Sequence, residues 1–150
     1  MDEGPKNLSW LLGEAKDLAL RHMRERLVQA GYEDIRSPQG QVFRHLGPDG
    51  ARLTDLAERA GMSKQAFAEH VAHLEEHGYV TRVPDPDDGR AKLVVPTARG
   101  LAAMAIASAA FAELEELWAQ DIGAERMAAM RAGLEAITLG VPASAAPPSH

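Results

Sequence analysis

The chain has 150 residues, of which 45% are hydrophobic and 5% aromatic, and its formal net charge is −6. This length is enough for one buried core, and an alanine-rich, aromatic-poor composition favours packed helices over a β-sandwich. Cysteine is absent, which excludes disulfides, thiolate metal sites and cysteine nucleophiles. The sequence has neither an apolar run of about 18 residues nor a secretory signal, so we expect a cytoplasmic protein without a membrane partner.

Two helices are predicted in the N-terminal part of the chain. The first runs from about residue 9 to residue 30, where apolar residues recur at three- and four-residue spacings until Gly31 ends the pattern. The second begins with Ser37 as its N-cap and Pro38 at the first helical position, and it continues to about Leu46. Glycine and proline in residues 47–50 then predict a turn.

Four more helices are predicted further along the chain. A helix over residues 54–61 is followed at once by a second one, which Ser63 caps and Gly78 ends. Thr97 caps a long helix that continues to about residue 119. Gly123 separates this long helix from a last one with apolar residues at helical spacing.

Two strands are predicted between these helices. Residues 80–83 and 92–95 alternate in polarity, and residues 84–89 are rich in proline, aspartate and glycine, so we expect a hairpin with a long tip. The tail at residues 140–150 is rich in proline, alanine and serine and is expected to be disordered. The order of four helices, a hairpin and two helices predicts a mainly α (α+β) fold.

Residues 53–67 are typical of a helix-turn-helix. The first helix needs a small side chain where the two helices cross, which Ala57 supplies, and the turn needs tolerance of positive φ, which Gly61 supplies. The second helix has an apolar stripe that is predicted to face inward, formed by Phe67, Val71 and Leu74. Its opposite face could enter a major groove and carries Lys64, Gln65, Glu69, His70 and His73. Taken alone, the segment also fits an ordinary helical hairpin.

The hairpin that follows favours DNA binding over this alternative. A two-stranded wing places its tip beside the duplex, where Arg90 can enter the narrow, electronegative minor groove. Asp88 lies two residues earlier, and we expect its carboxylate to orient the Arg90 guanidinium by a charge-assisted hydrogen bond. The predicted DNA-contacting residues are Ser63, Lys64, Gln65, His70, His73, Arg82, Arg90 and Lys92.

Several segments carry a resemblance to a known family. They are LTDLA at residues 53–57, LEEHGYV at 74–80 and DPDDGR at 85–90, followed by TARG at 97–100. This pattern resembles the MarR (multiple antibiotic resistance regulator) family of winged helix-turn-helix transcriptional regulators. The resemblance is dense from about residue 53 to residue 100, and elsewhere it is carried only by the order and length of the helices.

The resemblance implies a homodimer whose two winged lobes straddle a pseudo-palindromic operator in double-stranded DNA. It implies an N-terminal dimerisation helix in residues 1–36, a DNA-binding lobe in residues 37–96 and C-terminal dimerisation helices in residues 97–139. It also implies that a small ligand, often aromatic and anionic, releases the DNA. On this interpretation the protein is a repressor and not an enzyme.

Candidate residues for dimerisation and ligand binding lie outside the helix-turn-helix. Helices on both flanks expose more apolar surface than one small lobe can cover, and mutual burial in a dimer resolves this. The predicted dimerisation residues are Leu8, Leu11, Leu12, Phe111, Trp118, Met127, Met130 and Leu134. The candidate ligand-binding residues are Trp10, His22, Arg26, Phe43 and His45.

No cofactor, metal site or catalytic site is predicted. His70, His73 and His77 share one helix at three- and four-residue spacings, but no cysteine or acidic triad joins them at ligand spacing. We therefore expect solvated or phosphate-facing histidines. If they face phosphates, their protonation would strengthen DNA binding as the pH falls through about 6.5. The sequence also lacks a nucleophile elbow, a phosphate loop and a metal motif.

Charge keeps a second hypothesis open. The family commonly has a basic residue where Glu69 stands, and often another where His73 stands, and a carboxylate that faces phosphates is repelled by them. Seven basic and eight acidic residues lie between Arg52 and Arg99, so this segment has no cationic excess. Glu69 either accepts from a cytosine amino group, or points aside, or weakens DNA binding. In the last case, a dimer with little DNA affinity would act as a small-molecule sensor or protein-interaction module.

Overall fold

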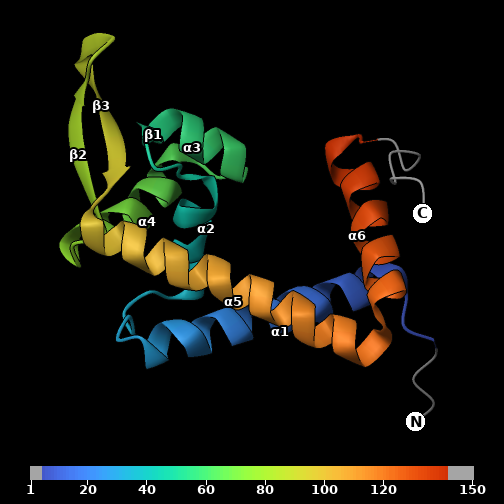
Figure 1. Cartoon of the computed structure of the whole chain (residues 1–150). Helices are drawn as coiled ribbons and strands as arrows, with labels where there is room; N and C mark the ends of the chain where they lie inside the picture. The colour runs from blue at the N-terminus through green and yellow to red at the C-terminus, as the bar shows by residue number, and fades with distance from the viewer. Residues whose placement is uncertain (1–4, 142–150) are drawn as a thin grey trace, which may run out of the picture. The chain divides into compact units, whose positions relative to one another are not determined.

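The computed structural model describes residues 5–141 as six helices and a three-stranded antiparallel sheet (Figure 1). The helices are α1 (Leu8–Gln29), α2 (Ser37–His45), α3 (Leu53–Ala60), α4 (Lys64–Glu76), α5 (Ala98–Ile122) and α6 (Ala124–Leu139). The strands are β1 (Ala51–Arg52), β2 (Val80–Asp85) and β3 (Asp88–Pro96), in the spatial order β1–β3–β2. The mainly helical, winged helix-turn-helix fold is confirmed, and β1 is an additional strand that the sequence pattern does not predict.

The chain forms two compact units, Met1–Ala110 and Phe111–His150, and the boundary between them lies within α5. The first unit contains the whole sheet and the hydrophobic core cluster, and the second contains the end of α5 and all of α6. Of the tail that is predicted to be disordered, residues 142–150 lie outside the described residues. Among the described helices, none combines the length and the apolar character needed to cross a membrane.

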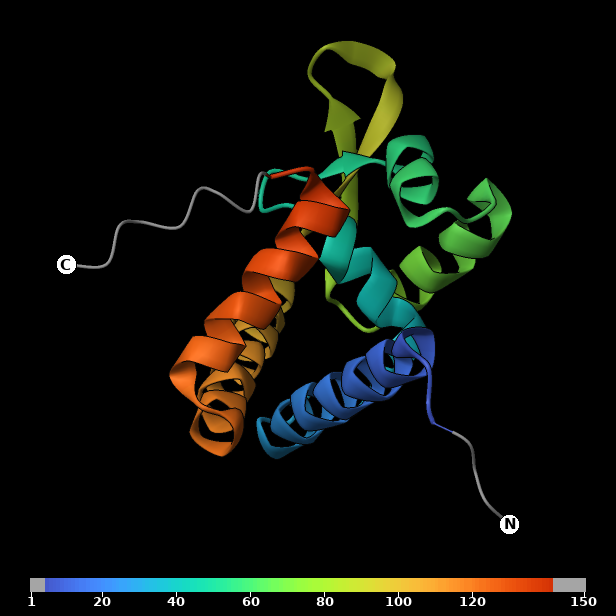
Figure 2. The ribbon, with the colours of Figure 1, turned by 90° about the vertical axis from the view of Figure 1, so that its right-hand side faces the viewer.

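The core of the first unit joins the helices to the sheet. Its most deeply buried large side chains are Val42, Leu56, Phe67, Val71, Leu74, Tyr79, Val80 and Val94. Helix α2 packs against α3 and α4, and α4 packs against β2, so these helices gather at the base of the ribbon (Figure 2). The burial of Phe67, Val71 and Leu74 confirms the predicted inward stripe of α4.

Local signals in the sequence account for the helix-turn-helix. Gly61 follows α3 in the left-handed region at φ +65°, and the buried Ala57 accepts a hydrogen bond from Met62 N–H through its carbonyl. Ser63 Oγ then accepts from Ala66 N–H at 3.1 Å and caps α4. Both predicted end signals are thus confirmed.

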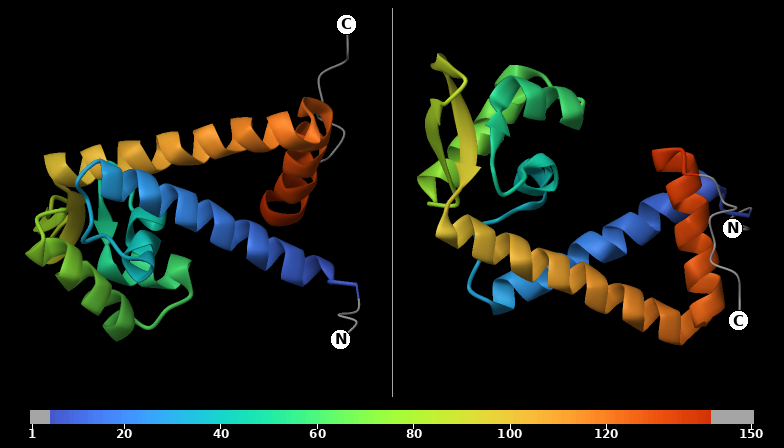
Figure 3. Two further views of the ribbon diagram at one scale, coloured as in Figure 1. Left: turned by 90° about the horizontal axis from the view of Figure 1, so that it is seen from below. Right: turned by 45° about the horizontal axis from the view of Figure 1, so that its top comes forward.

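The long tip predicted for the hairpin is wrong. Strand β2 continues to Asp85 and β3 begins at Asp88, which leaves only Pro86 and Asp87 in the turn. The Asp85 side chain, only 6% exposed, accepts from Asp87 N–H at 2.9 Å and so holds this turn closed. The two strands project beyond α3 and α4 as a ribbon (Figures 1 and 3).

Of the predicted starts of α5 and α2, the first is confirmed and the second differs by one residue. Thr97 Oγ1 accepts from Gly100 N–H at 3.1 Å, which confirms the predicted cap of α5. Helix α2 is capped by Arg36 and begins at Ser37, one residue earlier than predicted. The Arg36 N–H donates to Gln39 Oε1 at 3.1 Å, so the cap is supplied by a side chain inside the helix.

Candidate nucleic-acid interface

The outer face of α4 is polar and exposed. Phe67, Val71 and Leu74 are fully buried on its inner side, which orients the helix in the lobe. On the opposite side, three predicted DNA-contacting residues are exposed, namely Ser63, Lys64 and Gln65. Glu69, whose carboxylate would repel phosphates, is exposed there as well. His70 is half-buried on the same helix. The small side chains Ala68 and Ala72 lie between the polar ones and allow a close approach to a partner surface.

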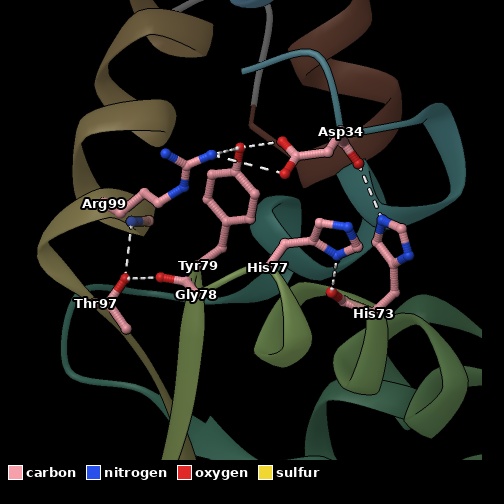
Figure 4. A network of polar contacts seen from close by, with 8 residues as sticks. Asp34, His73, His77, Gly78, Tyr79, Thr97 and Arg99 are labelled. Atoms are coloured by element: carbon pink, nitrogen blue, oxygen red, sulfur yellow. Dashed lines mark hydrogen bonds and ion pairs between the residues drawn. The ribbon is translucent and has the colours of Figure 1, made fainter. Parts of the chain in front are cut away.

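His73 is placed differently from the other predicted contacts. Its Nε2 lies 3.0 Å from the Asp34 carbonyl oxygen, and its ring lies 4.3 Å from the ring of His77 between centroids (Figure 4). His77 Nδ1 in turn lies 2.8 Å from the His73 carbonyl oxygen. The expectation that His73 is solvated or phosphate-facing is therefore wrong, because its ring joins α4 to the segment before α2.

The ribbon carries Arg90 on a bulge. Pro84 pairs with Lys92 and Asp85 pairs with Asp88, so residues 89–91 of β3 have no partner in β2. A bulge re-aims the side chains that it contains. Arg90 is exposed, and its guanidinium makes no hydrogen bond or ion pair with another described residue. The position is suited to contact a partner beyond the chain.

Asp88 does not act on Arg90 in the predicted way. Its Oδ1 accepts from the Arg90 backbone N–H at 3.1 Å, and no ion pair joins the two side chains among the described residues. A short aspartate side chain two residues before its partner reaches the backbone amide easily, as in an Asx-turn. Asp88 therefore shapes the backbone under Arg90 and leaves the guanidinium unpaired.

The two other predicted wing cations lie lower on the ribbon. Arg82 Nε lies 3.4 Å from Glu75 Oε2, which ties β2 to the end of α4. Lys92 is exposed on β3. Arg82 and Lys92 are thus both at the surface, but Arg82 shares its charge with a carboxylate.

An ion pair between the half-exposed Arg52 and the buried Asp85, at the base of the turn, was not predicted from the sequence. Arg52 on β1 donates to Asp85 Oδ2 from Nε at 2.7 Å and from Nη2 at 2.6 Å. The Asp87 N–H and the Arg52 side chain hold the pKa of Asp85 below its usual range, and the Asp85 carboxylate raises the pKa of Arg52. Since the two residues are 33 positions apart and β1 has two residues, no local pattern indicates their contact.

A second polar network joins α4, α5 and the segment before α2 (Figure 4). Tyr79 donates its hydroxyl proton to Asp34, and Arg99 Nη2 donates to the Tyr79 oxygen at 2.9 Å. Arg99 also lies over the Tyr79 ring and 3.6 Å from Asp34 Oδ2. Burial alone would raise the pKa of Asp34. The hydrogen bond from Tyr79 and the positive charge of Arg99 outweigh this effect, so the pKa of Asp34 is lowered.

The candidate ligand-binding residues have different surroundings among the described residues. Trp10 lies under Lys6 Nζ at 3.8 Å, and Arg26 donates to Gln29. Phe43 packs edge-on against Tyr79. The pKa of His45 is lowered mainly by burial and also by the positive charges of Arg44 and Arg59. His22 is half-buried on α1. An open cavity of about 380 Å³ on α1 is lined by Arg21, Arg24, Glu25, Val28 and Gln29.

The predicted dimerisation residues lie mostly at the surface. Those that are exposed to solvent in the single chain are Leu8, Leu11, Leu12, Phe111, Met130 and Leu134. Trp118 and Met127 are half-buried. Within the described part of the chain, no group of three or more histidine, cysteine or acidic residues could hold a metal ion.

Comparison with known proteins agrees with this architecture. The sequence model described as MarR family matches residues 33–91. CouR from Rhodococcus jostii RHA1, bound to p-coumaroyl-CoA, is 25% identical and superimposes with a TM-score of 0.67 over 88% of this chain and 92% of its own. No curated protein sequence matches the chain.

Two further structures share the fold. The transcriptional repressor CouR bound to a 23-mer DNA duplex is 22% identical, with a TM-score of 0.68 over 87% of this chain and 92% of its own. Wild-type MarR from E. coli, in its apo form, is 20% identical, with a TM-score of 0.69 over 89% of this chain and 98% of its own. The winged lobe of this chain is similar in sequence to the MarR family model, and the fold of the chain is similar to that of MarR-family transcriptional regulators.

Proposed function

We propose that the protein is a homodimeric, sequence-specific DNA-binding regulator that represses transcription until a small ligand binds. The observation that carries the proposal is the exposed polar face of α4 in the same lobe as a ribbon whose Arg90 is unpaired. A helix of this width fits the major groove, and an arginine on a projecting ribbon fits the adjacent minor groove. The DNA-bound structure of the similar repressor CouR supports this assignment.

The contacts divide by groove. Lys64 and Gln65, in the first turn of α4, would reach base edges in the major groove, and Arg90 would enter the minor groove. Lys92 and Arg82 would lie along the phosphate backbone. His70 remains a candidate at the border of the helix, whereas His73 is left out because its ring contacts Asp34. Phosphate contacts supply affinity and orientation, and base-edge contacts supply specificity.

Exposed apolar side chains support the homodimer. Leu11 on α1 is 51% exposed and Ile137 on α6 is 79% exposed, and α6 contains no buried residue at all. An isolated 16-residue helix is marginally stable in water, so α6 gains stability by covering its apolar side chains. In a two-fold dimer the same helices of a second copy would cover them, and the two lobes would read half-sites about 10 base pairs apart.

The proposal includes a small ligand that is both aromatic and anionic. CouR was solved with p-coumaroyl-CoA, which is aromatic at one end and anionic at the other. A ligand of that chemistry would need cations and apolar surface together, and the open cavity on α1 offers Arg21 and Arg24 beside Val28. We propose this cavity, completed by the dimer partner, ahead of the five residues named from the sequence.

The DNA-binding proposal is tested on a duplex that the protein selects from fragments of its own genome. Arg90→Ala should lower the affinity for this duplex about tenfold or more, because a minor-groove arginine contributes on the order of 1–3 kcal/mol. Arg21→Ala, on α1, removes the same charge away from the lobe and is the matched control. Equal affinities for the two variants in a gel-shift titration would contradict this map of contacts.

A second function is favoured by Glu69 and the net charge of −6. Glu69 is exposed on α4 and makes no ion pair with another described residue, so its charge faces any partner of that helix. A winged dimer with little DNA affinity would then serve as a small-molecule sensor or a protein-interaction module. Titration with genomic fragments at low salt separates the two functions, since phosphate contacts make DNA binding strongly salt-dependent.

A further inference from the structure

The base of the ribbon is braced from outside the hairpin by β1. Ala51 and Arg52 pair with Val94 and Leu93 on the free side of β3. This pairing brings Arg52 alongside the turn, where its Nε and Nη2 both donate to Asp85 Oδ2, at 2.7 and 2.6 Å. Two donors from a planar guanidinium fix a carboxylate in orientation as well as in position.

Two separate hydrogen bonds hold the turn between Asp85 and Arg90, on either side of the ladder pair Asp85–Asp88. Asp85 Oδ1 accepts from Asp87 N–H at 2.9 Å, in the middle of the turn. On the other side of the turn, Asp88 Oδ1 accepts from Arg90 N–H at 3.1 Å. Arg90 lies in the bulge of residues 89–91, where no β2 partner restrains the backbone. The backbone of Arg90 is thus held by the turn and not by the sheet ladder.

Asp85 depends on Arg52 for its charge balance. Its side chain is 6% exposed, and Arg52 is the cation with which it pairs among the described residues. Removing the half-exposed Arg52 would leave the charge of the buried Asp85 carboxylate uncompensated, and the turn would relieve this by moving or by taking up a proton. Loss of Arg52 would therefore free the carboxylate that closes the turn.

We propose that Arg52 is a positioning residue for DNA binding, which acts through Asp85 and the turn to fix the direction in which Arg90 leaves the ribbon. The proposal rests on the proposed function, since it concerns the same minor-groove contact. Arg52 itself touches no base or phosphate in this scheme. Its effect on DNA affinity must therefore pass through Arg90.

The first arm of the test needs no DNA. Amide hydrogen exchange of Asp87 and Arg90 is measured by NMR in the free protein, for the wild type, Arg52→Met and Arg59→Met. Arg59 is an exposed arginine of α3 in the same lobe and is the matched control. We expect Arg52→Met to accelerate exchange at both amides about fivefold or more, and Arg59→Met to leave it unchanged. Unchanged exchange in Arg52→Met would overturn the relay.

The second arm is a double-mutant cycle on the duplex selected by the wild-type protein. Arg52→Met should lose most of the affinity that Arg90→Ala loses, and the double variant should bind no more weakly than Arg90→Ala alone. Arg52→Lys should behave like Arg52→Met, because it keeps the positive charge but not the two-nitrogen contact. Losses that multiply in the double variant, or full affinity in Arg52→Lys, would show a direct or general effect and overturn the proposal.

Failure of the proposed function gives a different result. A wild-type chain that binds no duplex refutes DNA binding itself, while the exchange measurement still decides whether Arg52 holds the turn. A wild-type chain that binds, with Arg52→Met binding equally well, refutes only the positioning role. Thermal unfolding of each variant shows whether the lobe remains folded, and an unfolded variant is replaced by Asp85→Asn, for which the same pattern is expected.

Discussion

Tyr79 combines a buried ring with a committed hydroxyl. The ring is fully buried and packs against Tyr32 and Phe43, while the hydroxyl O–H donates to Asp34 and the hydroxyl oxygen accepts from Arg99. Burial and the hydrogen bond to Asp34 raise its pKa from 10.0 to about 12. The folded chain therefore holds this proton more tightly than the unfolded chain does.

This shift predicts a loss of stability at alkaline pH. The contribution of Tyr79 is fully present below pH 10 and is lost as the pH rises from 10 towards 12, by about 2–3 kcal/mol of the free energy of unfolding. Chemical denaturation at a series of pH values measures it. Tyr79→Phe has no hydroxyl to ionise, so its stability should fall less across this range. Parallel curves for the two proteins would contradict the assignment.

The substitution Glu69→Gln measures how much DNA affinity is lost through one carboxylate on α4. If the face of α4 meets a duplex, Glu69→Gln should raise affinity for DNA of any sequence by about fivefold at low salt, because repulsion between like charges is on the order of 1 kcal/mol in water. Glu76→Gln makes the same charge change at the other end of the helix. Equal gains from both variants would show that only net charge matters and that Glu69 faces no phosphate.

At the scale of elements, the features that the sequence predicts correctly are those determined by residues a few positions apart in the chain. Ser63 and Thr97 cap helices through bonds to residues three positions on, and Gly61 ends α3 by its own backbone conformation. The parts that were missed depend on distant partners. Strand β1 forms because β3 is there to pair with it, and His73 is drawn to Asp34, 39 positions away. A pattern within one helix cannot show which of its polar residues a remote loop will engage.

The start of α5 explains why a glycine follows Arg99. A Cβ on Gly100 would lie 2.0 Å from the Tyr79 carbonyl oxygen, a backbone atom that cannot move without shifting β2. The closeness arises because Thr97 N–H donates to that carbonyl at 3.0 Å and draws α5 onto the end of α4. The TARG segment of residues 97–100 is therefore a packing junction, in which Thr97 caps the helix and Gly100 permits the contact.

Gly100→Ala should consequently destabilise the lobe by about 2 kcal/mol or more, as overpacking against backbone does. Gly13→Ala is the matched control, since a Cβ there has no neighbour within 4 Å and α1 is helical on both sides. The control should be neutral or up to about 1 kcal/mol more stable, because alanine favours helix. Urea denaturation compares the two, and equal midpoints would refute the steric argument.

For the whole molecule, the two units differ in how much of their apolar surface they bury. The first unit has a continuous core from α1 into α5, around which the winged lobe packs. Helix α6 in the second unit has no buried residue, although Met130, Leu134 and Ile137 recur on one face at four- and three-residue spacing. Such a stripe is typical of a helix that packs against a partner.

A dimer in which this stripe is buried predicts a specific response to charge. Met130→Glu and Leu134→Glu should shift the protein from dimer to monomer at micromolar concentration, because each would bury a carboxylate without a partner. Ala132→Glu puts the same charge on the opposite, exposed face of α6 and should leave the dimer intact. Sedimentation velocity distinguishes the two states. A wild-type monomer would contradict the dimer, and it would also remove the reason for two half-sites, since one lobe alone reads about half of a palindromic operator.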